Sequence, residues 1–327
     1  MAGFWVVAET NADGTLAKSS TELATLARAL AEQAGGSIAV SGVVVAAKPD
    51  VAAAELATYV PSVVAVAEPL AAEHAWAQLA AERVAEVIDR DGPTLVLTGA
   101  GPDGRDVAGT LLALLDGAVL VNATSVTWQD GESVEMSVFG GKLITTSAFA
   151  DGANLRIVTV RPNVTTAAPA ASPGKVESRA AGATPTLPAV KIVDRVAASG
   201  AAVSIDDARV IVAGGRGVGS PEGFELVQQL ADRLGGAVGA TRAAVDAGWI
   251  PYAQQIGQTG KIVKPQLYLA LGISGAIQHK VGMQTAGTIV AVNRDPDAPI
   301  AEFADMLVVG DLVEVGTALL EELGPKR

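Results

Sequence analysis

The chain has 327 residues, of which 50% are hydrophobic, and its formal net charge is -12 at pH 7. An acidic chain without clustered Lys or Arg is poorly suited to a phosphate backbone, so nucleic acid is excluded as a partner. There is no cysteine and there are only two histidines, His74 and His279, which excludes disulfides and iron–sulfur clusters and argues against zinc.

Without these groups, any redox chemistry would need a bound organic cofactor. The first residues, MAGFWVVAET, lack the basic and apolar regions of a signal peptide and the Arg-rich pattern of a transit peptide. The hydrophobic residues are mainly Ala and Val, and no run of about 18 uninterrupted apolar residues occurs. We therefore expect a cytoplasmic protein without a membrane span.

The first part of the chain alternates short apolar runs with amphipathic segments. A strand from Phe4 through VVAE leads into a helix over 20–33, whose Leu23, Leu26 and Leu30 share one face. The alternation continues with strands over 38–46, 63–66 and 94–97 and helices over 51–59, 73–89 and 106–115. Strands separated by helices predict a mostly parallel, doubly wound α/β sheet.

After Gly117 the pattern changes to successive strands over 119–126, 133–139, 142–148 and 155–160. Their Gly-containing turns predict an antiparallel extension of the first sheet. Ala, Pro, Ser, Thr and Gly then dominate residues 162–188, which is typical of a linker, and a short strand is expected over 191–196.

The last part of the chain repeats strand and helix at shorter intervals. Strands are predicted over 210–213, 237–239, 266–271, 288–292 and 306–309, with helices over 221–234 and 312–323. They predict a second α/β domain with a five-stranded parallel sheet. The expected organisation is an N-terminal domain over 1–163, a linker with a connecting strand over 164–205, and a C-terminal domain over 206–327.

Polar clusters follow two neighbouring strands of this second domain. The strand over 266–271 ends in Gly272-Ile273-Ser274-Gly275, and the strand over 288–292 ends in Asn293-Arg294-Asp295. Ligands of open parallel sheets bind at the carboxyl ends of the strands, and Ser274 is predicted to cap the next helix. The polar residues of this region suit a large, flat, partly anionic ligand: Thr241, Arg242, Gln258, Thr259, Ser274, Gln278, His279 and Asn293.

Two glycine-rich loops invite a nucleotide-binding interpretation. GGRGVGS from Gly214 fails as a dinucleotide fingerprint, because Ser220 stands where the third glycine belongs and no acidic residue ends the next strand. This disfavours an NAD-dependent oxidoreductase, and Arg216 is better explained as a charge partner for a pyrophosphate. GAGPDGRD over 99–106 either cradles a phosphate, with Arg105 as counter-ion, or merely turns the chain.

Six ordered motifs resemble the alpha subunit of electron transfer flavoproteins. They are AGGRGVGS from Ala213, GATRAAVDAG from Gly239, IGQTGK from Ile256, LGISGAIQH from Leu271, VAVNRDPDAPI from Val290 and VVGDL from Val308. Before Ala208 the resemblance is looser, resting on VVAE, on GRDVAGTL from Gly104 and on IVTVRP from Ile157. The resemblance implies that the C-terminal domain binds FAD.

The resemblance also implies a set of cofactor-binding residues. They are Arg216, Thr241, Arg242, Ile256, Gly257, Gln258, Thr259, Ser274, Gly275, Ala276, Ile277, Gln278, His279, Asn293, Asp311 and Leu312.

The family assigns roles to several of these residues. Arg242 would lie against the isoalloxazine ring, and Thr259 would place its hydroxyl at flavin N5. His279 would donate toward flavin O2 and titrate in a useful pH range, while Asn293, Asp311 and Leu312 would hold the ribityl or AMP portion.

The local patterns alone leave blander interpretations open. They are a helix-start arginine at 242, a turn threonine at 259, a buried core histidine at 279 and a helix cap at 311. Trp249 and Tyr252 are interpreted as packing residues rather than electron relays.

The resemblance implies an electron carrier rather than an enzyme with its own substrate. It would pair with a beta subunit, which is expected to hold AMP, so the N-terminal domain would contact that subunit without binding a cofactor. Electrons would come from flavoprotein dehydrogenases such as the acyl-CoA dehydrogenases of fatty acid β-oxidation, and pass to a membrane quinone oxidoreductase. Two alternatives remain: a bifurcating or nitrogen-fixation type of flavoprotein, and a structural subunit whose cofactor site has decayed.

Overall fold

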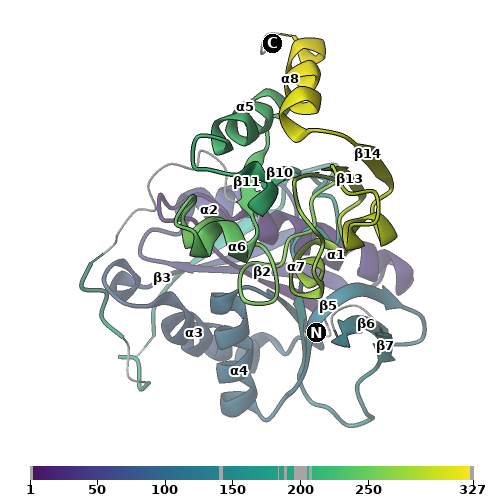
Figure 1. Ribbon diagram of the computed structural model, residues 1–327. Helices are drawn as coiled ribbons and strands as arrows, with labels where there is room; N and C mark the ends of the chain where they lie inside the picture. The colour runs from purple at the N-terminus through teal and green to yellow at the C-terminus, as the bar shows by residue number, and fades with distance from the viewer. Residues whose placement is uncertain are drawn as a thin grey trace. The chain divides into compact units, whose positions relative to one another are not determined.

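The computed structural model describes residues 3–139, 143–182, 184–187, 190–194, 205 and 208–324. The chain divides into two compact units, Met1–Arg195 and Val196–Arg327. Each unit is an α/β body with its own sheet and its own buried core (Figure 1).

The first unit contains a nine-stranded sheet with the order β7-β6-β5-β8-β4-β1-β2-β3-β9. All neighbours pair in parallel except β5 with β6 and β6 with β7, which confirms the predicted mixed architecture. The strands are β1 (Gly3–Ala8), β2 (Ala39–Ala46), β3 (Ser62–Ala67), β4 (Leu95–Gly99), β5 (Ala118–Trp128), β6 (Glu132–Val138), β7 (Leu143–Ser147), β8 (Arg156–Val160) and β9 (Lys175–Ala180).

Helices cover both faces of this sheet, as expected for a doubly wound fold. Alternate residues of β1 point to opposite sides: Phe4 and Val6 pack with α1 (Lys18–Gln33) and α2 (Asp50–Leu56). Trp5 and Val7 pack with α3 (Trp76–Asp91) and α4 (Pro102–Leu115), which lie side by side below the sheet in Figure 1. A short turn of helix, η1 (Pro69–Ala72), precedes α3.

The segment predicted as a linker contains a strand. β9 pairs in parallel with β3 over six residues, from Ser62 with Lys175 to Ala67 with Ala180. An edge strand is held by backbone hydrogen bonds, and five of the six β9 side chains are exposed, so no apolar periodicity marks it in the sequence. Of the strand expected over 191–196, Lys191 forms only an isolated bridge with His74, and residues 195 and 196 lie outside the described residues.

The loop over 99–106 is shorter than predicted, because α4 already begins at Pro102, a residue well suited to the first helical turn. A Cβ atom added to Gly99 or Gly104 would lie 2.6 or 2.7 Å from Oε1 of Glu9. A carboxylate packed against these glycines would repel a phosphate, which favours the interpretation of this loop as a turn.

The second unit contains a five-stranded sheet with the order β11-β10-β12-β13-β14, and every pair is parallel, as predicted. Its strands are β10 (Val210–Gly214), β11 (Ala237–Ala240), β12 (Leu267–Leu271), β13 (Thr288–Asn293) and β14 (Met306–Val309). The helices are α5 (Phe224–Leu234), α6 (Arg242–Asp246), α7 (Ile277–Met283) and α8 (Leu312–Leu323), with short 3-10 turns η3 (Arg216–Val218), η4 (Tyr252–Gln254) and η5 (Pro299–Glu302).

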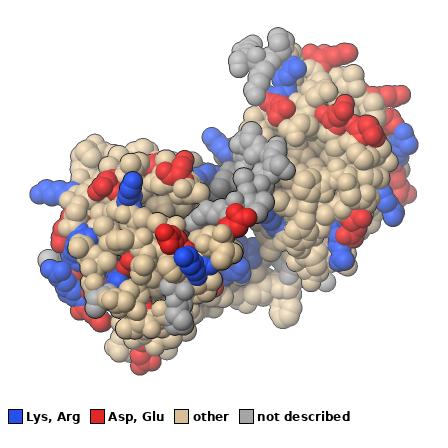
Figure 2. Space-filling view, turned by 90° about the vertical axis from the view of Figure 1, so that its left-hand side faces the viewer, with Lys and Arg blue, Asp and Glu red and all other residues tan. Residues whose placement is uncertain are grey.

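The surface carries charges of both signs. Figure 2 shows Lys and Arg interspersed with Asp and Glu on the visible face, with broad uncharged areas between them. Among the described residues, no helix is both long and apolar enough to cross a bilayer.

A buried ion pair links Glu68, the N-cap of η1, to Arg83 of α3 in the first unit. Nε of Arg83 lies 2.7 Å from Oε2 of Glu68, and both side chains are only 2% exposed. Arg83 also contacts Glu86 through Nη1 at 2.6 Å, and Glu68 accepts a hydrogen bond from the backbone N–H of Leu70. Removing one partner of such a pair leaves an uncompensated buried charge, which is far more costly than removing both.

We therefore expect Arg83→Met to destabilise the first unit by about 3–5 kcal/mol. In the double variant Arg83→Met with Glu68→Gln, most of this loss should be recovered, because the introduced amide is neutral and can still accept from Leu70. Urea unfolding of the two variants tests this, and a single variant that unfolds like the wild type would contradict it.

Candidate functional site

A hollow of about 670 Å³ lies at the carboxyl ends of the strands of the second unit. Segments that directly follow β10, β11, β12 and β13 form its walls, at the sheet edge where open parallel sheets bind ligands. The lining residues are Arg216, Gly217, Thr241, Arg242, Ala243, Asp246, Ile256, Gly257, Gln258, Thr259, Gly272, Ile273, Ser274, Gly275, Ala276, Gln278, His279, Asn293, Asp295, Ala298 and Pro299.

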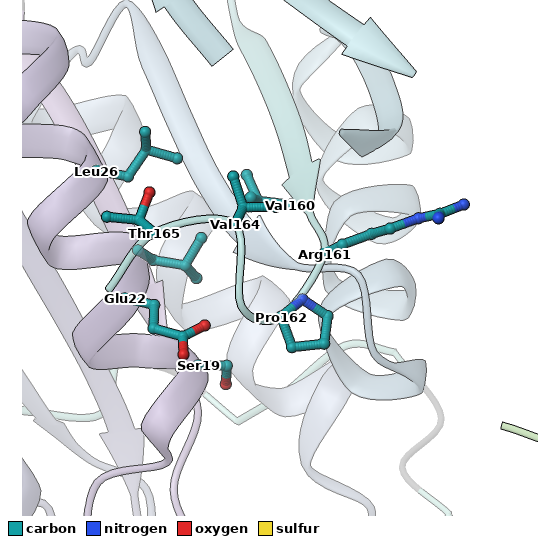
Figure 3. A pocket seen from close by; sticks show the side chains of 9 residues that line it. Ser19, Glu22, Leu26, Val160, Arg161, Pro162, Val164 and Thr165 are labelled. Atoms are coloured by element: carbon teal, nitrogen blue, oxygen red, sulfur yellow. The ribbon is translucent and has the colours of Figure 1, made fainter. Parts of the chain in front are cut away.

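The first unit has a much smaller pocket beside the end of β8 (Figure 3). Ser19, Glu22, Leu26, Val164 and other residues enclose only about 10 Å³, which is the space of about one water molecule. Figure 3 shows the side chain of Arg161 pointing away from it. This pocket is too small for an organic cofactor.

Two glycine loops meet backbone to backbone at the floor of the hollow. The N–H of Gly217 donates to the carbonyl of Gly272 over 3.0 Å, and a Cβ on Gly272 would lie 2.8 Å from Cα of Gly217. Gly272 also has a φ of +62°, which L-residues rarely adopt. Glycine at both positions lets the ends of β10 and β12 approach closely and leaves room above them.

The structure corrects the prediction that Ser274 caps a helix. Gly275, with a φ of +84°, turns the chain after Ser274, and α7 begins only at Ile277 with Ala276 as its N-cap. Ser274 is exposed at the rim, and its carbonyl accepts from the N–H of Ile300. Within the described residues, the backbone N–H groups of Ser274, Gly275 and Ala276 take no hydrogen-bond partner, so they remain available to a ligand.

Two arginines bring positive charge to the hollow. Arg242 begins α6 and pairs with Asp246 one turn later, with Nε 3.2 Å from Oδ2 and both side chains more than half exposed. Arg216 in η3 is exposed and has no carboxylate partner in the described part of the chain. Its charge is therefore the more available of the two for an anionic group.

Two threonine hydroxyls belong to the wall. Oγ1 of Thr241 is buried without a hydrogen-bond partner, although such buried groups are normally satisfied. Oγ1 of Thr259 accepts from Nε2 of Gln255 at 3.0 Å, which leaves its own proton free to be donated. Both positions were predicted, and the hydroxyl of Thr241 needs a partner that the described residues do not supply, whereas the exposed hydroxyl of Thr259 can donate to a ligand.

The structure corrects part of the expectation for His279. The side chain is only 6% exposed, with Nδ1 3.0 Å from the carbonyl oxygen of Ile256 and Nε2 2.9 Å from the hydroxyl of Tyr268. Burial lowers its pKa from 6.5 to about 4, although the bond to Ile256 opposes this. The ring is therefore neutral at physiological pH and both its nitrogens are engaged, so it neither titrates near neutrality nor has an N–H to spare.

Three predicted residues lie outside the lining. Ile277 is the exposed first residue of α7, and Leu312 packs beneath Gly272. Asp311 caps α8 by accepting from the N–H groups of Val313 and Glu314. Its ion pair with Arg294, followed by these cap bonds, lowers the pKa of its carboxyl.

Asn293 does line the hollow, but its amide also shapes the rim. Nδ2 donates to the carbonyl of Ile273 at 2.9 Å, and Oδ1 accepts from the N–H of Asp295 at 3.0 Å. The side chain therefore fixes the loops after β12 and β13 relative to each other.

The predicted cofactor-binding residues did not include several lining residues: Gly217, Ala243, Asp246, Gly272, Ile273, Asp295, Ala298 and Pro299. Of these, Gly272, Ile273 and Asp295 belong to the two clusters at the strand ends where a ligand was expected. Asp246 had a usable signal, because it stands four residues after Arg242 at the spacing of helical ion pairs. The others are apolar, glycine or loop residues, whose place depends on how the strand ends converge.

Comparison with known families covers both units. The family described as Electron transfer flavoprotein domain matches residues 4–185, and the one described as Electron transfer flavoprotein FAD-binding domain matches residues 204–284. A relative from Mycobacterium tuberculosis named Electron transfer flavoprotein subunit alpha is 42% identical over 317 residues, covering 97% of both chains. The chain belongs to the electron transfer flavoprotein alpha subunit family.

Two other relatives extend this comparison. One of the same name from Mycobacterium leprae is 42% identical over 319 residues, covering 96% of both chains. A protein from Clostridium saccharobutylicum named Protein FixB is 36% identical over 324 residues, covering 98% of this chain and 96% of its own. Members of this alpha subunit family are redox carriers that pair with a beta subunit, and the cofactor of the second unit is FAD.

The residues of the hollow fit FAD. The volume suits a large organic ligand, and among the described residues the orphaned hydroxyl of Thr241, the free N–H groups near Gly275 and the unpaired charge of Arg216 offer donors to an anionic, oxygen-rich molecule. The hollow, Thr241 and Arg216 all lie in the second unit, where Thr241 and Arg216 fall in the segment matched as the FAD-binding domain.

The low pKa of His279 has a consequence for stability. Because the unfolded chain binds a proton near pH 6.5 and the folded chain only near pH 4, stability falls as the pH drops through this window. Between pH 7 and pH 5, His279 should cost the second unit about 2 kcal/mol. We expect His279→Gln to remove this part of the pH dependence in urea unfolding.

His74→Gln is the matched control, since it removes the chain's other histidine, in the first unit, and should leave that pH dependence unchanged. An equal loss of stability between pH 7 and pH 5 in wild type and His279→Gln would contradict a neutral, buried His279.

The contact between Gly217 and Gly272 predicts that a single methyl group distorts the floor of the hollow. Gly272→Ala should weaken FAD binding at least about tenfold, because its Cβ would press on Gly217 and displace the floor. Gly235→Ala is the control: Gly235 has nearly the same φ, +65°, but nothing lies within 4 Å of its Cβ position.

The left-handed backbone should cost each variant about 1 kcal/mol of stability, and Gly272→Ala should lose more, because its Cβ also presses on Gly217. Only Gly272→Ala should lose affinity in an FAD titration. Equal FAD affinity in the two variants would show that the floor does not shape the binding site.

Proposed function

We propose that the chain is the FAD-carrying subunit of a heterodimeric electron carrier, which takes electrons from flavoprotein dehydrogenases such as acyl-CoA dehydrogenases and passes them to a quinone oxidoreductase. The observation that carries the proposal is the orphaned hydroxyl of Thr241 in a large hollow within the FAD-binding unit. When bound, FAD supplies one- and two-electron redox chemistry.

The hollow supports a carrier rather than an enzyme with its own substrate. Its histidine is neutral with both ring nitrogens engaged, and Asp246 is paired with Arg242. Oδ1 of Asp295 accepts from the N–H of Asp297. A general acid–base catalyst needs a group free to exchange protons with a substrate, and each of these groups already has at least one protein contact.

The chain's own residues would bind and tune the cofactor. Arg216 and the N–H groups of Ser274, Gly275 and Ala276 would hold its anionic part, while Thr241 and Thr259 would contribute hydroxyls. Arg242 would favour the reduced, more negative state, and Asp246 would moderate that charge. The N-terminal unit would contact the beta subunit, which is where AMP is expected.

A second candidate is the nitrogen-fixation or bifurcating type, favoured by the 36% identity to Protein FixB over nearly the whole chain. It differs in the partners that donate and accept electrons, whereas the FAD site is shared.

The test uses the chain co-purified with its beta subunit. Under anaerobic conditions, an acyl-CoA dehydrogenase with its substrate should bleach the flavin absorption within the turnover time of the dehydrogenase. Bleaching by NADH in the presence of ferredoxin, and none by the dehydrogenase, would favour the second candidate. A complex that contains no FAD and takes up none would refute the proposed carrier.

Arg242 and Asp246 should shift the midpoint potential of the bound FAD in opposite directions. Arg242→Gln removes a positive charge and should lower the potential, whereas Asp246→Asn removes the opposing charge and should raise it. For charges exposed to water the effect is on the order of 1 kcal/mol, or roughly 40 mV per electron.

Potentiometric titration of the two variants and the wild type tests this. A shift of the same sign in both variants would point to a general disturbance of the site instead of to charge.

A further inference from the structure

The ring of His279 is fixed by two contacts that determine which nitrogen carries its proton. A backbone carbonyl can only accept a hydrogen bond, so the 3.0 Å contact with Ile256 requires a proton on Nδ1. In the neutral ring, Nε2 is then bare and can only accept. The group that faces it is the hydroxyl of Tyr268, at 2.9 Å.

Tyr268 is suited to donate this hydrogen bond. It lies in β12 and is completely buried, in the core formed by β10, β12 and β13. Burial raises the pKa of its hydroxyl well above the ordinary value, so the phenol keeps its proton. In the described part of the chain, Nε2 of His279 is the only hydrogen-bond partner of this hydroxyl.

The alternative, a protonated ring, fits the surroundings poorly. Nε2–H would then donate to the oxygen of Tyr268, whose own proton would need another acceptor inside the core. A buried positive charge would also lack a carboxylate partner, since no ion pair of His279 occurs among the described residues. The neutral ring satisfies all three groups at once.

We propose that Tyr268 is a positioning residue of the cofactor site: by donating to Nε2, it fixes His279 as the neutral Nδ1–H tautomer and ties the pocket wall on α7 to the central strand β12. This inference rests on the proposed function where it concerns the cofactor. The ring of His279 is then an uncharged part of the wall and has no free N–H. Among the lining residues, only Arg216 and Arg242 carry a positive charge.

The tautomer can be read directly by NMR of the complete complex. The chain is labelled with ¹⁵N-histidine and combined with an unlabelled beta subunit. A protonated and a bare ring nitrogen differ widely in ¹⁵N chemical shift, and His74→Gln assigns the two histidines of the chain. The expected result at pH 7 is a protonated Nδ1 and a bare Nε2 in His279.

Two tyrosine variants then test the role of the hydroxyl. In Tyr268→Phe, Nε2 loses its donor, so the neutral ring is less favoured and the pKa of His279 should rise by about one unit, a tenfold gain in proton affinity. Tyr252→Phe is the matched control, because its hydroxyl donates to the carbonyl of Thr259 and not to His279. It should leave the His279 signals unchanged.

A bare Nδ1 in the wild type, or a ring that titrates near its ordinary pKa, would overturn the proposal. An unchanged His279 in folded Tyr268→Phe would do the same. If Tyr268→Phe does not fold, the wild-type tautomer alone decides the outcome. The flavin absorption of the same wild-type sample tests the proposed function separately. A colourless complex would contradict the proposed FAD carrier, but the ¹⁵N chemical shifts of His279 could still be measured.

Discussion

The site depends on the close approach of two backbones at the end of a parallel sheet. β10 and β12 are neighbours in register, so the loops that follow them, at Gly217 and Gly272, leave the sheet at the same edge and touch. Two backbones can approach this closely only where neither residue carries a Cβ atom. The hollow above them is therefore set by backbone geometry, and the polar side chains are arranged around it.

The electrostatics of the hollow follow from how deeply each group is buried. His279 and Tyr268 are buried in the core and satisfy each other as neutral groups, since charge there would be costly. Arg242 and Asp246 lie at the surface, where water makes an ion pair weak but leaves its charge adjustable. A carrier needs a fixed lining and a tunable potential, and this division between core and rim provides both.

Much of this arrangement could be predicted from the sequence, because strands with apolar runs and the glycine and polar clusters at their ends are local features. The five parallel strands of the second unit were found in this way, and so was the role of Asp311 as a helix cap. β9 was not predicted, because it pairs with β3 through backbone hydrogen bonds and most of its side chains are exposed. The hydrophobic pattern of the sequence therefore does not reveal an edge strand of this kind.

Other features could not be predicted because they depend on contacts between distant residues. The neutral state of His279 follows from its burial. The position of its proton depends on Tyr268 on β12 and on the carbonyl of Ile256, 23 residues earlier in the chain. Ser274 looks like a helix cap in sequence, but the left-handed Gly275 delays the helix until Ile277. Leu312 follows a predicted strand, as expected, but it packs beneath Gly272, outside the lining of the hollow.

The most direct test of the central claim is an experimental structure of the complex with FAD bound. The account predicts cofactor density in the hollow above Gly217 and Gly272, with Thr241 and Arg216 in contact with it. FAD bound elsewhere on the chain, or bound only by the beta subunit, would contradict it.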